Sequence, residues 1–148
     1  MKAILERVLN TSKGLDTVAL RMGAGAIFAA HGAQKLFGWY GGYGLEATAN
    51  WMVSIGLEPG MLMAALAGGA EFFGGLLLIV GLLVRPVALV LAATMVVAIV
   101  SVHLQNGLFL ANNGYEFGLA LLVITVGLAF RGAGSLSADR ALQATLAS

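Results

Sequence analysis

Residues 59–84 read PGMLMAALAGGAEFFGGLLLIVGLLV, a continuous apolar stretch whose only ionisable side chain is that of Glu71. A helix rises 1.5 Å per residue and the hydrocarbon core of a bilayer is about 30 Å thick, so about 20 apolar residues can cross it. The stretch therefore predicts a membrane-spanning helix with one acid near its centre. Such an acid is costly in hydrocarbon, and it usually faces the protein interior and serves a function.

Three further apolar stretches predict three further spans, at about 17–37, 86–104 and 115–130. The chain is 59% hydrophobic and only 10% charged, with a mean hydropathy of +0.93, whereas a soluble domain carries roughly 25% charged residues. We therefore expect one membrane domain over residues 1–148, an all-α transmembrane four-helix bundle. Short interfacial helices are expected at about 1–13, at 45–55 in the aromatic loop, and after Ser135.

The basic residues predict how the bundle is oriented. Six of them fall on one side of a four-span arrangement: Lys2, Arg7, Lys13, Arg85, Arg131 and Arg140. Only Lys35 lies toward the other side, and Arg21 lies just inside the first span, where it either reaches back to the surface or pairs with Asp16. By the positive-inside rule, both termini are expected in the cytoplasm and the protein in the inner membrane of the cell.

Composition also excludes several classes of function. The net charge is +1 and no basic run exists, so we expect no nucleic-acid partner. The absence of cysteine excludes thiol–disulfide exchange, iron–sulfur clusters and cysteine zinc sites, and no haem or flavin motif is evident. We predict no metal site, because the Glu-x-x-His pattern of di-iron bundles is missing.

The ionisable residues of the spans are expected to meet near the outer side. His31 and Lys35 are four residues apart and share a helix face, with Gln34 beside it. Helical rise places His31 about 9 Å below the outer surface, counted from Phe37, and Glu71 about 18 Å below it, counted from Pro59. Two further residues lie at the outer ends of the last two spans, His103 and Glu116.

This set of side chains suits proton-linked chemistry on a quinone. Histidine titrates near neutral pH, and a quinone headgroup needs hydrogen-bond donors at its carbonyls and a route for protons. We therefore predict Glu71 and His31 as the catalytic, proton-exchanging residues. The predicted quinone-binding residues are Lys35, Gln34, His103 and Glu116.

The same residues carry a resemblance to the DoxX family of small four-span membrane proteins. The resemblance rests on R-x-G-x-G-x-I-F-x-x-H-G-x-x-K-L from Arg21 to Leu36, on Gly69-x-Glu71 with Gly74-Gly75, and on the Arg85-Pro86 turn. It continues through His103, Asn106-Gly107 and Asn113-Gly114-x-Glu116. The matching positions cover nearly the whole chain.

The resemblance implies a four-helix membrane bundle with both termini inside, but it assigns no substrate residue. Relatives similar to DoxD look like subunits of a thiosulfate:quinone oxidoreductase, and others are linked to quinone or catechol resistance and to membrane complexes against oxidative stress. A quinone-interacting oxidoreductase subunit, working with a redox partner subunit or as a homo-oligomer, is the preferred reading. Two alternatives stay open: a non-catalytic accessory or assembly subunit of a redox or stress complex, and a small proton-coupled transporter.

Overall fold

The computed structural model describes residues 8–11 and 14–147. Within these residues every regular element is a helix and no strand is present. The longer helices are α2 (Val18–Phe37), α3 (Gly44–Ser54), α4 (Gly60–Val80), α5 (Val84–Ala98), α6 (Glu116–Arg131) and α7 (Ala138–Ala147). The all-α prediction is thus confirmed, whereas the helix expected at about 1–13 falls mostly outside the described residues.

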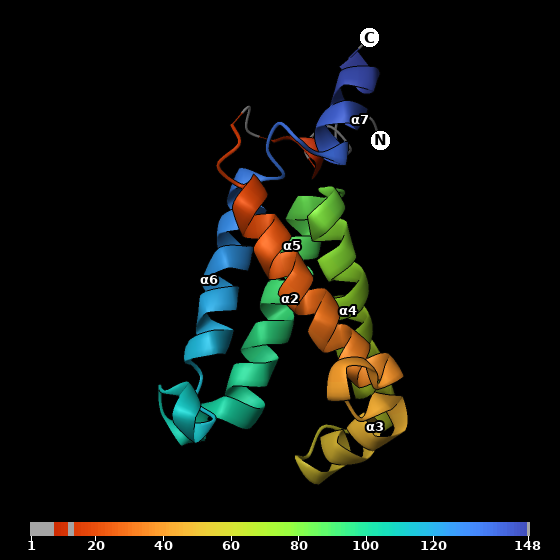
Figure 1. Cartoon of the computed structure of the whole chain (residues 1–148), viewed down its shortest axis with the longest axis vertical. Helices are drawn as coiled ribbons and strands as arrows, with labels where there is room; N and C mark the ends of the chain where they lie inside the picture. The colour runs from red at the N-terminus through yellow and green to blue at the C-terminus, as the bar shows by residue number, and fades with distance from the viewer. Residues whose placement is uncertain (1–7, 12–13, 148) are drawn as a thin grey trace.

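Helices α2, α4, α5 and α6 run along the long axis of the molecule (Figure 1). Helix α2 crosses α4 along much of its length, α5 packs along α6, and α4 also contacts α5. Helix α3 packs across α4 and the end of α2. Helix α7 lies at one end of the molecule, and α3 lies at the opposite end, as does the segment 104–114.

The observed helix bounds are close to those expected, except at the turn between α4 and α5. Helix α4 ends at Val80, and the chain reverses through Gly81 and Leu83, whose φ angles are 74° and 52°. Helix α5 then begins at Val84. The expectation of a turn at Arg85-Pro86 is therefore wrong: Pro86 lies in the first turn of α5, where its missing N–H leaves no helical hydrogen bond unmade.

Glycines bring α2 and α4 into backbone contact. A Cβ atom on Gly32 would lie 2.3 Å from the backbone nitrogen of Phe72, and one on Gly25 would lie 2.7 Å from the carbonyl oxygen of Gly75. Small residues at helix interfaces allow this close approach. The contacts fix the register of α2 on α4, and this register positions the polar residues considered below.

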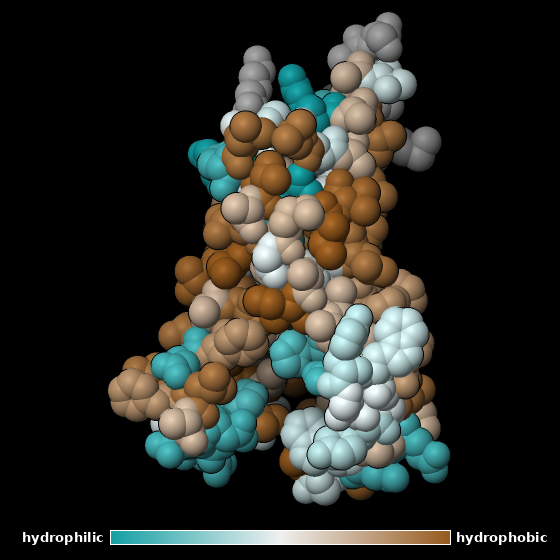
Figure 2. Space-filling model, viewed as in Figure 1, coloured by the Kyte–Doolittle hydropathy of each residue, from teal (hydrophilic) through white to brown (hydrophobic). Residues whose placement is uncertain are grey.

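The surface carries an apolar zone between two more polar ends. Large hydrophobic side chains are exposed along the long helices, Leu66, Phe73, Leu89 and Val123 among them. Figure 2 shows hydrophobic residues over the middle of one face and hydrophilic residues gathered near both ends. In the described part of the chain, two helices, Gly60–Val80 and Val84–Asn106, are long and apolar enough to cross a membrane. The other two expected spans stay predictions.

A buried arginine joins α2 to the end of α4 and to the segment before α7. Arg21 is 2% exposed, and its guanidinium donates hydrogen bonds to the carbonyls of Leu78, Ile79, Ala133 and Leu136. Two of these carbonyls, those of Leu78 and Ile79, belong to the last turn of α4, where the regular helical hydrogen bonds end and only the N–H of Gly81 bonds to Leu78. The expectation that Arg21 reaches the surface or pairs with Asp16 is wrong: Arg21 is buried against these four carbonyls, and the ion pair of Asp16 is with Arg131.

Candidate functional site

An ion pair joins α2 to α4. Lys35 Nζ lies 2.5 Å from Glu71 Oε2. The side chain of Glu71 is only 5% exposed, while that of Lys35 is 25% exposed. Because Gly32 lets α2 lie directly against α4, Lys35, one turn further along α2, reaches the carboxylate.

Two pockets meet at this ion pair. Pocket A, of about 130 Å³, lies between α2, α5 and α6 and is walled by Phe28, His31 and Phe117 among others. Pocket B, of about 170 Å³, lies between α3, α4 and α5 and is walled by Trp51 and Met52 among others. Four residues line both pockets: Lys35, Glu71, Ala98 and His103. The ion pair and His103 therefore stand in a wall that two small, mostly apolar hollows share.

The backbone around His103 departs from a regular α-helix. Residues Ile99–His103 form a π-helical turn at the end of α5, a feature that is frequent at functional sites. The Nδ1 atom of His103 lies 2.9 Å from the carbonyl oxygen of Asn113. A carbonyl can only accept a hydrogen bond, so Nδ1 carries the proton. In the neutral imidazole the second nitrogen, Nε2, is then an acceptor.

His31 lies on the other side of pocket A. Its ring centroid is 6.1 Å from that of Phe117, so the imidazole packs at the junction of α2 and α6. The residue is exposed, unlike Glu71, and within the described residues no hydrogen bond or ion pair joins the two. They share a pocket, but the direct partner of Glu71 is Lys35 rather than His31.

The structure does not bring Gln34 and Glu116 into the site. The amide of Gln34 donates to the carbonyl of Tyr40, 3.2 Å away, in the turn after α2. The Oε1 atom of Glu116 accepts a hydrogen bond from the backbone N–H of Leu110 at 2.6 Å. Neither residue lines pocket A or pocket B. Both side chains stabilise loops, and the expected convergence on one site holds only for the other four residues.

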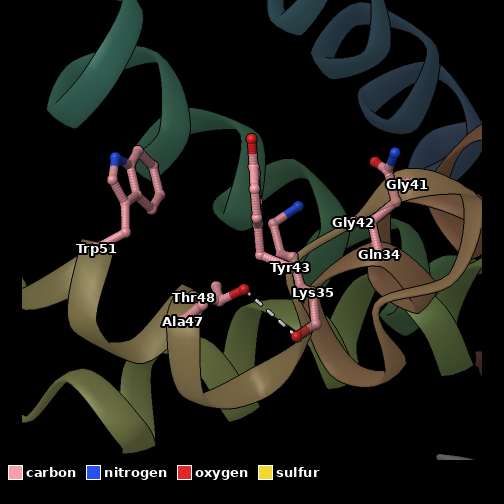
Figure 3. Close-up of a pocket in the computed structure, with 8 residues that line it drawn as sticks. All are labelled: Gln34, Lys35, Gly41, Gly42, Tyr43, Ala47, Thr48 and Trp51. Carbon is pink, nitrogen blue, oxygen red and sulfur yellow. Dashed lines mark hydrogen bonds between the residues drawn. The ribbon is translucent and has the colours of Figure 1, made fainter.

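A third hollow lies beside Lys35, toward α3. It measures about 600 Å³, and its walls include Gln34, Tyr43 and Trp51. Figure 3 shows the rings of Tyr43 and Trp51 projecting to the same side of this hollow, with the Thr48 hydroxyl directed at the Lys35 carbonyl. The sequence predicted an interfacial helix at 45–55, within the loop that carries these aromatic residues. Their place beside Lys35 depends on how α3 folds back over α2.

The described residues contain no group of three or more His, Cys, Asp or Glu side chains that could hold a metal ion. What the site offers instead is one ammonium, one buried carboxylate and two imidazoles around apolar walls. These groups can donate hydrogen bonds, accept them and exchange protons.

Comparison with known proteins points to one family. The sequence model of the DoxX family matches residues 17–104. The Bacillus subtilis (strain 168) protein named "Putative oxidoreductase CatD" is 34% identical over 131 residues, which cover 88% of this chain and 90% of that protein. An "Uncharacterized protein" of Haemophilus influenzae (strain ATCC 51907 / DSM 11121 / KW20 / Rd) is 35% identical over 98 residues, 61% of this chain and 65% of that protein. No solved structure matches the chain at a comparable level.

Proposed function

Because this chain belongs to the DoxX family of membrane proteins, we propose that it is a quinone-binding subunit of a membrane oxidoreductase. In this proposal α2, α4, α5 and α6 span the inner membrane as a four-helix bundle. The end with α7 faces the cytoplasm and the end with α3 faces outward. The two strongly apolar helices and the basic residues that cluster on one side of the expected spans support this arrangement.

The observation that carries the proposal is the Lys35–Glu71 ion pair in the wall between pockets A and B. A quinone headgroup is a flat, apolar ring with carbonyl oxygens that accept hydrogen bonds. Lys35 Nζ has three N–H groups, and the ion pair with Glu71 leaves others free for a carbonyl. The apolar walls of pocket B, with Trp51 and Met52, suit the ring.

Proton transfer in this proposal runs through Glu71 and the two histidines. Reduction of a quinone takes up two electrons and two protons, and oxidation of the hydroquinone releases them. The Nε2 atom of His103 accepts a proton or a hydrogen bond from a hydroquinone hydroxyl, since Nδ1 is committed to Asn113. The Glu71 carboxylate can accept the second proton close to the ring, and exposed His31 passes protons outward.

Electrons come from outside this chain in the proposal, from a partner subunit or a donor substrate. The chain has no cysteine and no evident flavin or haem motif. The similarity to a protein named an oxidoreductase supports the hypothesis of an oxidoreductase subunit over that of a proton-coupled transporter.

The test is quinone binding to the purified protein in lipid nanodiscs, followed by tryptophan fluorescence or calorimetry. We expect Glu71→Gln and Lys35→Met each to weaken binding at least tenfold, and Glu71→Gln with His31→Ala to abolish it. Glu58→Gln is the matched control, because Glu58 is an exposed acid that does not line pocket A or B.

Unchanged quinone binding in the Glu71→Gln, His31→Ala double variant would show that the assigned site is wrong. If instead the wild-type protein binds no quinone, and Glu71→Gln only lowers the melting temperature or releases a larger partner from native membranes, the accessory-subunit reading is correct.

A further inference from the structure

An apolar groove lies next to pocket B, between α4 and α5. We call it the α4–α5 groove and define it by Leu66, Ala67, Ala70, Val90, Ala93 and Val97. Its volume is about 380 Å³. Five residues line both the groove and pocket B: Met52, Leu57, Ala67, Thr94 and Val97. The two hollows therefore lie next to each other.

Small residues line part of this groove. Ala67 and Ala70 stand on α4 and Ala93 stands on α5. Gly69 lies directly before Ala70 on α4, and a Cβ atom on it would meet no neighbouring atom within 4 Å. A further hollow, lined by Gly69 and Pro86 among others, shares Ala70 and Val90 with the groove. Helical rise places Pro86 about 22 Å along the helix from Ser101, so the three adjacent hollows together extend over about that length.

The groove contains no free polar group among its lining side chains. Its one hydroxyl, that of Thr94, donates to the carbonyl of Val90 at 3.0 Å. Leu66, Val90 and Val97 are 58%, 53% and 50% exposed along its rims. These rims belong to the two helices that are apolar enough to cross a membrane, so in the proposed membrane arrangement the groove faces lipid.

We propose that the α4–α5 groove holds the long apolar tail of a quinone whose headgroup lies in pocket B. This inference rests on the proposed function and narrows its substrate to lipid-soluble quinones with an isoprenoid or alkyl tail. A headgroup at the Lys35–Glu71 pair must pass its tail to the hydrocarbon, and the groove is an apolar hollow that shares five lining residues with pocket B. The hollow beside Tyr43 is instead lined by the end of α2, by α3 and by the turn between them, and α3 lies at one end of the molecule.

The groove acts as an exit for the tail more than as a source of affinity. Lipid chains are as apolar as the groove, so moving a tail from lipid into it gains little hydrophobic free energy. Blocking the groove, however, leaves the tail with no path once the headgroup is seated. Filling the groove should therefore exclude tailed quinones and spare tailless ones.

The experiment compares two probes that share one headgroup, a quinone with a long isoprenoid tail and the same ring with a methyl group in place of the tail. Both are titrated into wild-type protein and into Ala70→Leu and Ala93→Leu variants in nanodiscs. Ala93 is already exposed, so its variant keeps the test usable if Ala70→Leu folds poorly. The matched control is Ala65→Leu, since Ala65 is exposed on α4 and lies outside the groove.

We expect both groove variants to weaken binding of the tailed quinone at least tenfold and to change binding of the tailless ring less than twofold, with no change for either probe in Ala65→Leu. Equal losses for both probes, or no loss for either, would overturn the groove assignment. If Lys35→Met and Glu71→Gln leave binding intact while the groove variants still discriminate between the probes, the tail path stands and the headgroup site is wrong. If wild-type protein binds neither probe, both proposals fail.

Discussion

Lys35 Nζ on α2 and Glu71 Oε2 on α4 lie 2.5 Å apart and form the ion pair at the centre of the candidate site. Glu71 is 3% exposed as a residue and sits among apolar helices. A buried charge is tolerated when a partner neutralises it, and removal of one partner leaves the other charge uncompensated. The pair therefore has a structural consequence that is separate from any role in quinone binding.

The first prediction is that removing either side chain of this pair lowers the free energy of unfolding, because the other charge is left without a partner. Breaking a buried pair costs about 3–5 kcal/mol, and because Lys35 is one-quarter exposed we expect Lys35→Met to fall at the lower end of that range. The Lys35→Met, Glu71→Gln double variant should be more stable than the sum of the two single effects predicts. Chemical unfolding in detergent of the four proteins gives the double-mutant cycle, and strict additivity would show that the two side chains are not coupled.

The sequence indicated which residues lie near one another better than it indicated their relative depths along the bundle axis. It placed His31 and Lys35 on one helix face and Glu71 in the middle of an apolar helix. Counting from each helix end, however, put Glu71 far below Lys35. The structure shows Gly32 against Gly68 and Phe72, so Phe37 is about 8 Å beyond this contact on α2 while Gly60 is about 12 Å beyond it on α4. Helix α4 extends past the end of α2, and no single-helix count reveals that offset.

The other departures have local causes. Gln34 and Glu116 are drawn to backbone groups of nearby loops, and their polarity alone does not distinguish loop stabilisation from ligand binding. His103 was expected near the site. Its tautomer follows from its contact with the Asn113 carbonyl, and its backbone lies in a π-helical turn. Residue spacing in the sequence predicts neither feature. The turn between α4 and α5 was misplaced because Leu83, a non-glycine residue, adopts a positive φ angle.

The second prediction concerns the glycine contacts that set the register of α2 on α4. Gly32→Ala should destabilise the protein by about 1–3 kcal/mol, because the added methyl group overlaps the backbone of Phe72 and Gly68. Gly23→Ala is the control on the same helix, since a Cβ atom there meets nothing within 4 Å and alanine is the better helix former. Melting temperatures in detergent check this, and equal effects of the two substitutions would show that the tight α2–α4 contact is absent.

The third prediction concerns Arg21, which serves four carbonyls from the segments 78–79 and 133–136. Lysine keeps the charge but cannot reproduce the planar, multi-donor geometry of a guanidinium. Arg21→Lys should therefore lower stability almost as much as Arg21→Met, and each should loosen the α7 end. Limited proteolysis near residues 133–137 together with thermal unfolding measures this. Full retention of stability by Arg21→Lys would mean that charge alone matters there.

The fourth prediction is a pH dependence that arises from Asp139. This residue is 1% exposed, and its carboxylate accepts hydrogen bonds from the backbone N–H groups of Leu83 and Val84 at 2.7 and 3.0 Å, at the start of α5. Burial raises the pKa of Asp139 above its ordinary value of 3.8, and the two backbone hydrogen bonds and the nearby Arg21 oppose this only in part. The folded protein therefore binds this proton more tightly than the unfolded chain does.

A raised pKa in the folded state means that the stability linked to Asp139 is fully present below the ordinary aspartate pKa and is lost as the pH rises through the pKa of the folded state. Melting temperatures measured upward from pH 3.5 should show this decline in the wild-type protein. Asp139→Asn does not titrate, so its curve should lack that component, and the difference between the two curves should level off once Asp139 is ionised in the folded state. Glu58→Gln, which alters an exposed acid, should leave the wild-type profile unchanged. Parallel curves for wild type and Asp139→Asn across the whole range would show that burial does not hold the proton on this carboxyl, and that the two backbone hydrogen bonds fully offset its desolvation.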